Sequence, residues 1–97
     1  MKIEWNEDKN RSNIRKHGLD FRDAEEMFRG VLLAEPDMRD DYGEKRWRGL
    51  GLIGGRTVQV VFSEREPETL RIISLRKATK RERKEFEKAV QNRLEAG

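Results

Sequence analysis

The 97-residue chain contains no cysteine and only one histidine, His17. These absences exclude a disulfide framework and a thiolate metal site, and a single histidine cannot hold zinc by itself. The N-terminus has no apolar run of signal-peptide length, and no segment approaches the roughly 20 apolar residues that a membrane-spanning helix needs. We therefore expect a cytoplasmic protein that requires no metal or other cofactor and has no membrane partner.

Hydrophobic residues are also scarce, at 34% of the chain against 42% charged residues. At this length the whole chain, residues 1–97, should form one domain with a small core. The formal net charge is only +3, but the 22 basic residues are unevenly placed. Arginine outnumbers lysine and suits bidentate phosphate contacts, so the bias mildly favours a nucleic-acid partner, although an arginine-rich genome would produce it too.

A strand pattern gives way to a helix pattern between Thr69 and Phe86. Residues 70–75 are mostly aliphatic with a period of two, whereas apolar residues recur at helical spacing from Thr79 onward. Thr79 followed by Glu82 forms a capping box, so the positive end of the helix dipole points back at the strand. The cations around this junction are Arg71, Arg76, Lys77, Lys80, Arg81, Arg83 and Lys84. Their density predicts a phosphate site.

The rest of the chain predicts an α+β fold. We expect a short strand over residues 2–5, helices over 7–17 and 21–28, and strands over 31–35, 45–53, 57–63 and 70–75. Asn6 and Asp20 are the expected N-caps, Gly18 ends the first helix, and Gly54-Gly55 and Glu66-Pro67-Glu68 are turns. The predicted architecture is two N-terminal helices, a four-stranded antiparallel meander and a C-terminal helix, with a short N-terminal strand.

Four segments together resemble the BrnT family of bacterial toxins. They are Trp5 with Lys9 and Asn10; Lys16-His17-Gly18 before Phe21; Gly43-Glu44-x-Arg46; and the run from Arg71 to Ala78 that leads to Glu82. The resemblance covers nearly the whole chain. It implies a compact relative of the RelE-type ribonucleases. Phe86 stands where relatives often have tyrosine, so no phenol can have a catalytic role at that position.

The resemblance also implies partners. BrnT-type proteins belong to toxin-antitoxin pairs, in which a ribbon-helix-helix antitoxin neutralises the toxin and binds the operator DNA of their operon. Because such antitoxins are dimers, we expect a two-plus-two heterotetramer. The expected activity is metal-independent cleavage of RNA, which would inhibit translation and arrest growth.

Metal-independent RNA cleavage needs a base for the 2′-hydroxyl, stabilisation of the crowded phosphate, and a proton for the leaving 5′-oxygen. Candidate phosphate-stabilising groups are Arg46, Arg65 and Arg76, the candidate bases are Glu44 and Glu82, and His17 is the side chain that ordinarily titrates near neutral pH. For His17 we prefer a helix-terminal role. In a meander, Arg46 and Arg65 should share one end of the sheet and Arg76 should lie at the other.

Further side chains are candidates for holding RNA. Tyr42 and Trp47 have the rings on which bases stack, although core packing is the preferred interpretation of Trp47. The candidate backbone contacts are Lys45, Arg71, Lys77, Lys80 and Arg81. The residues alone fit a non-catalytic basic adaptor for nucleic acid or an acidic protein almost equally well. The family resemblance favours the endoribonuclease.

Overall fold

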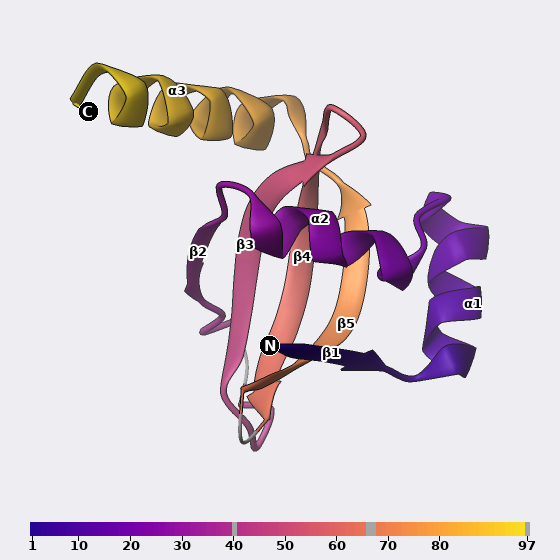
Figure 1. The fold of residues 1–97 in the computed structure, drawn as a ribbon. Coiled ribbons are helices and arrows are strands. Elements are labelled where there is room, and N and C mark those ends of the chain that lie inside the picture. Colours follow the sequence, from indigo (N-terminus) through magenta and orange to yellow (C-terminus); the bar gives the residue numbers. More distant parts are fainter. Residues whose placement is uncertain (40, 66–67, 97) are drawn as a thin grey trace.

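The computed structural model describes residues 1–39, 41–65 and 68–96 of the chain. Within them the elements are, in order, β1 (Lys2–Trp5), α1 (Glu7–His17), the 3₁₀ turn η1 (Phe21–Asp23), α2 (Ala24–Arg29), β2 (Leu33–Pro36), β3 (Arg46–Ile53), β4 (Arg56–Arg65), β5 (Thr69–Lys77) and α3 (Lys80–Ala96). Figure 1 shows a twisted sheet with α2 across one face and α3 leaving from one end. The predicted α+β class is confirmed.

The five strands form one mixed sheet in the order β1-β5-β4-β3-β2. Strands β2 to β5 make the predicted antiparallel meander. The expectation of a purely antiparallel, four-stranded sheet is wrong, because β1 joins as a fifth strand parallel to β5, with Lys2 opposite Thr69 and Trp5 opposite Ile72. The physical reason is that the meander leaves the outer edge of β5 unpaired, and β1 satisfies the backbone groups there.

The second predicted helix, over residues 21–28, starts as the 3₁₀ turn η1 and continues as α2. The Asp20 side chain accepts a backbone N–H at 3.0 Å in this first turn, which favours the tight start. Phe21, Ala24 and Met27 recur every three residues and are fully buried against the sheet. They supply the helical side of the core.

Glycines in β3 let the preceding segment pack directly onto the strand. A Cβ at Gly49 would lie 3.0 Å from Leu32 Cδ1, and one at Gly51 would lie 3.2 Å from Met27 Cε. Because Leu32 packs inward here, β2 begins only at Leu33, later than the predicted 31–35.

The other strand boundaries depart only slightly from prediction. β3 starts one residue late, while β4 and β5 run longer at both ends than predicted. The turn expected at Glu66-Pro67-Glu68 lies mostly outside the described residues.

Helix α1 is held by asparagines and not by an apolar face. Its one aliphatic side chain, Ile14, is 39% exposed, whereas Asn10 and Asn13 are buried. Asn10 accepts the N–H of Phe21 at 2.8 Å, and Asn13 accepts the N–H of Leu75 at 3.1 Å. The helix therefore fixes the η1 turn and binds the part of the β5 edge that β1 does not reach.

The predicted helix caps are confirmed. Asn6 accepts the N–H of Lys9 at 3.0 Å, and Gly18 ends α1 in the left-handed region with φ 70°. At α3 the Glu82 N–H donates to Thr79 Oγ1 at 3.1 Å, and the Thr79 N–H donates to Glu82 Oε1 at 2.8 Å. This is the reciprocal bonding of a capping box.

Candidate functional site

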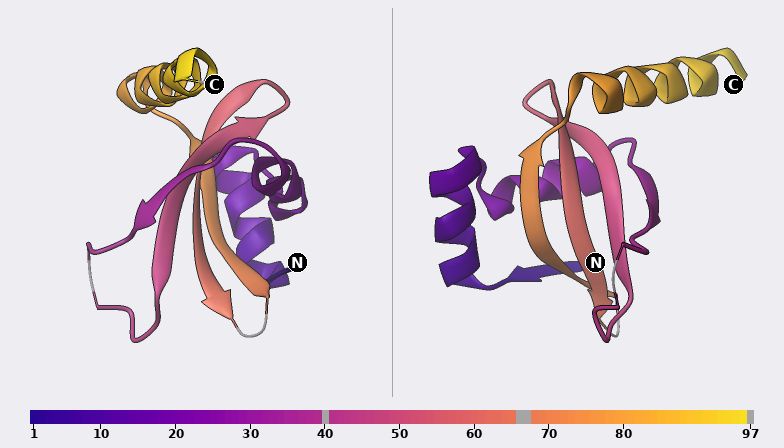
Figure 2. Two further views of the ribbon diagram at one scale, coloured as in Figure 1. Left: turned by 60° about the vertical axis from the view of Figure 1, so that its left-hand side comes forward. Right: turned by 180° about the vertical axis from the view of Figure 1, so that it is seen from behind.

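The two faces of the sheet differ in what covers them. One face packs on η1 and α2 and holds the core, whereas Figure 2 (right) shows no helix in front of the central strands on the other face. Strand alternation places polar side chains there, so we call it the open face. Its polar strand residues on β2 to β5 are Glu35, Arg46, Arg48, Gln59, Ser63, Arg65, Thr69, Arg71, Ser74 and Arg76.

At one end of the open face, Glu44 lies between two arginines. Its carboxylate is 3.2 Å from Arg46 Nε and 3.4 Å from Arg65 Nη2. The Arg46 guanidinium lies 4.0 Å from the centre of the Tyr42 ring. We call Tyr42, Glu44, Arg46 and Arg65 the Glu44 cluster. Strand pairing sets it up, because Arg46 begins β3 opposite Ser63, close to the end of β4. The predicted meeting of the two arginines is confirmed.

A second cluster occupies the strand-helix junction. Arg76 donates to both oxygens of Glu82, at 2.8 and 3.0 Å, and Gln59 Nε2 donates to the same carboxylate at 3.3 Å. We call Gln59, Arg76, Thr79 and Glu82 the Arg76 cluster. The bonds from Arg76, with those from Thr79, lower the pKa of Glu82 to about 2. The anion at this helix N-terminus is therefore the chain's own carboxylate, which is a weak proton acceptor near neutral pH.

The two clusters lie at opposite ends of the open face. Arg65 pairs with Thr69, the first residue of β5, and Arg76 lies near the end of the same strand. Seven residues at about 3.3 Å each separate these positions by roughly 20 Å. The predicted placement of Arg76 away from Arg65 is confirmed, and one phosphate cannot touch both clusters.

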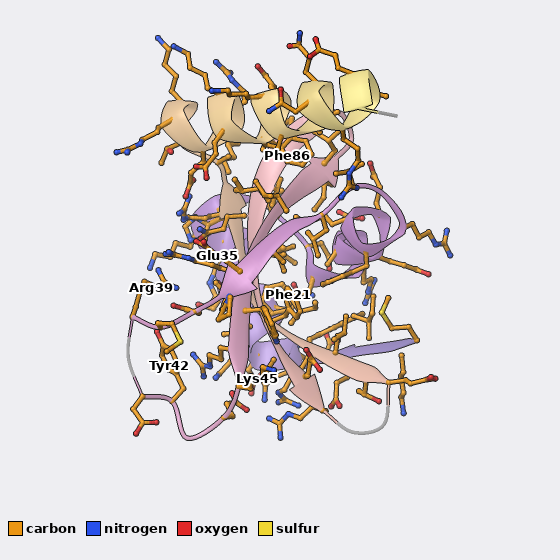
Figure 3. The ribbon with its side chains drawn as sticks, turned by 90° about the vertical axis from the view of Figure 1, so that its left-hand side faces the viewer. Phe21, Glu35, Arg39, Tyr42, Lys45 and Phe86 are labelled. Carbon is orange, nitrogen blue, oxygen red and sulfur yellow. The ribbon has the colours of Figure 1, made fainter. Side chains whose placement is uncertain are left out.

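Two further ion pairs, one on β2 and β3 and one at the start of the loop after β2, were not revealed by the sequence. Arg48 Nη2 is 2.9 Å from the Glu35 carboxylate, and Arg39 holds Asp37 through two bonds of 2.7 and 2.8 Å. The Arg39 bonds lower the pKa of Asp37, whose side chain is fully buried. The loop after β2 is therefore held to the rest of the protein at this position and is not simply solvated. Figure 3 shows Arg39 and Tyr42 side by side on this loop.

A hollow of about 490 Å³ extends from the Arg48–Glu35 pair to the Arg76 cluster. It lies between β2, β3, β4 and the first turn of α3, and its polar lining residues are Glu35, Arg48, Gln59, Thr79, Arg81, Glu82 and Glu85. Arg48 could have been found from the sequence, because it is two residues from Arg46 on one strand and so shares its face. Its partner Glu35 could not, since their contact depends on the register of β2 against β3.

The other RNA-binding candidates are dispersed. Trp47 packs on the core from the covered face, with the Lys45 ammonium 4.9 Å from its ring centre, so the preferred core assignment of Trp47 is confirmed. Arg71 pairs with Glu4 at 3.1 Å. Lys77, Lys80 and Arg81 are exposed around the junction.

His17 is the last residue of α1, and its side chain makes no hydrogen bond or ion pair with any described residue. The structure brings it to neither cluster. Among residues 1–39, 41–65 and 68–96 there is also no group of three His, Asp or Glu side chains arranged to hold a metal ion. In the same part of the chain, no helix is long and apolar enough to cross a membrane.

A small α+β domain with guanidinium groups along an open sheet face has the features of a protein that binds a phosphate backbone. Residues 5–82 match the family model described as the ribonuclease toxin BrnT of type II toxin-antitoxin systems. The crystal structure of the Brucella abortus ribonuclease toxin BrnT is similar, with a TM-score of 0.69 and 36% sequence identity over 82% of this chain and 99% of that chain. No curated protein matches the chain. The chain belongs to the BrnT family of ribonuclease toxins.

Membership of this family gives the chain an RNA substrate and an antitoxin partner. The match ends at Glu82, in the first turn of α3. The open face therefore lies within the matched residues, whereas most of α3 lies beyond them.

Proposed function

We propose that the open face cleaves RNA without a metal ion and that the reaction takes place at the Glu44 cluster. The observation that carries this proposal is the position of the Glu44 carboxylate between Arg46 and Arg65. Its contacts of 3.2 and 3.4 Å are longer than the bonds of 2.8 to 3.0 Å that Arg76 and Thr79 donate to Glu82, and no capping role occupies it. A carboxylate held this loosely beside two guanidinium groups can accept a proton while the arginines hold the phosphate.

In this mechanism Glu44 removes the proton of the 2′-hydroxyl, and the resulting oxyanion attacks the adjacent phosphorus. Arg46 and Arg65 stabilise the negative charge that develops on the phosphate oxygens. The bond to the 5′-oxygen then breaks, and this oxygen takes a proton from solvent. His17 lies outside the cluster, so we assign it to the end of α1. Arg46 already covers the Tyr42 ring, so Tyr42 is assigned to positioning Arg46 and bordering the RNA.

The Arg76 cluster has a different role in this proposal. Glu82 keeps Arg76 fixed at the end of the sheet, and the exposed Lys77, Lys80 and Arg81 add positive charge beside it. A strand of RNA that runs from the Glu44 cluster toward this junction would meet Arg48 on the way and the exposed cations of the junction at its end. The junction thus binds the substrate away from the bond that breaks.

The regulatory part of the proposal follows from the family. The antitoxin is a ribbon-helix-helix dimer that binds two copies of this chain, represses its operon through operator DNA and covers the open face with an acidic segment. Cleavage of cytoplasmic RNA by the free toxin inhibits translation. A complex that forms on the arginines of the open face should weaken as salt rises.

The test is cleavage of a defined RNA by the purified chain in the presence of EDTA. The expected result is undiminished cleavage by the wild type and by Arg93→Ala, which removes an exposed arginine far along α3, and loss of cleavage in Arg65→Ala. Loss of wild-type activity on chelation would overturn the metal-independent mechanism. Binding of RNA without any cleavage would instead favour the adaptor.

A further inference from the structure

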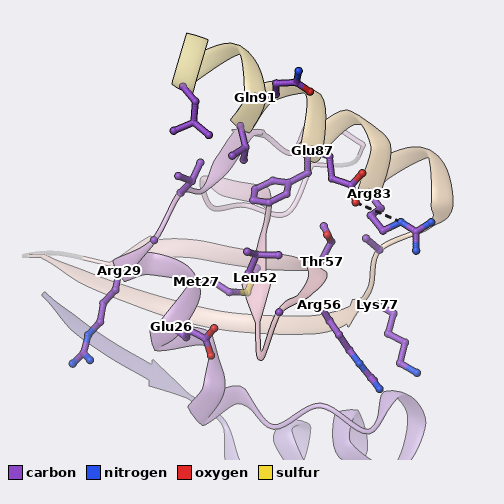
Figure 4. Close-up of a pocket in the computed structure, with 17 residues that line it drawn as sticks. Glu26, Met27, Arg29, Leu52, Arg56, Thr57, Lys77, Arg83, Glu87 and Gln91 are labelled. Carbon is purple, nitrogen blue, oxygen red and sulfur yellow. Dashed lines mark ion pairs between the residues drawn. The ribbon is translucent and has the colours of Figure 1, made fainter. Parts of the chain in front are cut away.

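A second hollow, of about 930 Å³, lies on a different side of α3 from the open face. Its apolar lining comes from three elements: Met27 in α2, Leu52 at the end of β3, and Phe86, Val90 and Leu94 in α3. Figure 4 shows Met27 and Leu52 on the floor of this space, with the helix above. We call it the α3 groove. The mechanism above uses none of its residues.

Helix α3 is only partly supported by the rest of the molecule. Phe86 is buried, but Leu94, two turns further along, is 76% exposed, and Leu52 on the floor of the groove is 41% exposed. Figures 1 and 2 show the second half of the helix projecting beyond the sheet. An apolar stripe that starts in the core and continues into open space fits an apolar partner better than water.

The charged residues on the rim of the groove indicate the charge of that partner. Arg56 and Lys77 are exposed on the rim and form no ion pair with any described residue, whereas Arg83 is paired with Glu87. The Glu26 carboxylate accepts the backbone N–H of Gly54 and keeps its negative charge, while Arg29 is paired with Glu25. The other three lining cations, Arg56, Lys77 and Arg83, outnumber the two lining carboxylates by one, so the net charge of the rim is positive. The complementary ligand is a segment with apolar residues in the centre and carboxylates at its flanks.

We infer that the α3 groove is the anchoring site of the antitoxin, which inserts one amphipathic, acid-flanked segment between α3 and the β3–β4 hairpin. This inference rests on the toxin-antitoxin function and adds a second site to it. The antitoxin then holds the toxin at the groove and blocks RNA at the open face with a different part of its chain.

The test compares two variants that place a new carboxylate on α3. Leu94→Glu puts the charge inside the groove, and Asn92→Glu puts it on an exposed position that does not line the groove. Since both residues are exposed, neither change should unfold the protein. The probe is the purified antitoxin encoded beside this chain, titrated by calorimetry into each variant. RNA cleavage by each variant alone is measured in parallel.

Leu94→Glu should weaken antitoxin binding at least about 30-fold, as expected of an apolar anchor, while Asn92→Glu binds as the wild type does. Both variants should cleave RNA at the wild-type rate, and the weakening should persist at high salt. Equal binding by wild type and Leu94→Glu, or equal weakening by both variants, would overturn the inference. So would a wild-type dimer in sedimentation that Leu94→Glu dissociates, since a second copy would then fill the groove. If the wild type binds antitoxin through Leu94 but cleaves no RNA, the inference about the groove is supported and the proposed ribonuclease mechanism is wrong.

Discussion

The two ends of the open face each hold a glutamate paired with arginine, but the two glutamates are held differently. Glu82 accepts two bonds from Arg76, a third from the Thr79 N–H and a fourth from Gln59. Among the described residues, Glu44 has two contacts, with Arg46 at 3.2 Å and Arg65 at 3.4 Å, and both are longer than the bonds from Arg76 and Thr79 to Glu82. A carboxylate with every lone pair engaged stabilises structure, whereas a less constrained one can exchange a proton with a ligand. Sequence position alone made the two look equivalent.

The largest expected difference between the ends is in catalysis. Glu44→Gln removes the proposed base and should lower the rate of RNA cleavage by about 10²–10⁴-fold. Glu82→Gln removes a carboxylate that scarcely accepts protons near neutral pH, so its cleavage rate should stay close to that of the wild type. The measurement is single-turnover cleavage of one labelled RNA, with the fold of each variant checked by circular dichroism. A larger loss for Glu82→Gln would move the reaction centre to the junction.

Arg65 and Arg76 should differ in the same way, with a somewhat smaller effect on the cleavage rate than that of Glu44→Gln. Arg65→Ala should slow cleavage by about 10²–10³-fold, because one donor to the developing charge is lost. Arg76→Ala should act mainly on RNA affinity, since the junction is assigned to binding, and Arg93→Ala should change neither quantity. Rates at saturating RNA, together with dissociation constants, separate these effects. Equal losses of rate at saturation for Arg65→Ala and Arg76→Ala would contradict the division of roles.

For stability the larger effect should come from the other end of the open face, at Glu82. Glu82→Ala removes the capping box and leaves Arg76 without its partner, which should lower the free energy of unfolding by about 1–2 kcal/mol. Glu44→Ala breaks a partly exposed arrangement and should cost at most about 0.5 kcal/mol. Urea unfolding followed by circular dichroism measures both. If Glu44→Ala proved the more destabilising, Glu44 would be a structural residue.

The bonds that hold Glu82 also predict a dependence of stability on pH. The pKa of Glu82 is lowered from 4.5 to about 2 in the folded protein. Its contribution to stability is therefore fully present above about pH 4.5 and is lost as the pH falls toward 2. Glu82→Gln should show a smaller decline than the wild type over this interval in denaturant midpoints measured at constant salt. Parallel curves of denaturant midpoint against pH for the two proteins would mean that the pKa of Glu82 is not lowered in the folded protein.

The sequence was most informative where one short motif determines the local structure. The capping box of Thr79 and Glu82 and the glycine end of α1 each depend on residues a few positions apart. It was least informative where distant segments meet. No local pattern indicates that β1 pairs with β5 in parallel. The partner edge is on a strand that begins some 65 residues later in the chain. The same limit applies to the site. The sequence predicted that Arg46 and Arg65 share one end of the sheet, but it did not indicate how many hydrogen bonds hold Glu44 and Glu82.

The buried asparagines of α1 have a further consequence for how copies of the protein behave toward one another. β1 pairs with β5 only from Thr69 to Ile72, and beyond that point Asn13 binds the Leu75 N–H. The helix thus closes the part of the β5 edge that β1 leaves unpaired against strand addition from a neighbouring molecule. Since α1 buries little apolar surface, its hold on that part of β5 depends on hydrogen-bond geometry. Replacing Asn13 with leucine would preserve bulk and lose that protection, leaving this part of β5 open to pairing with another copy.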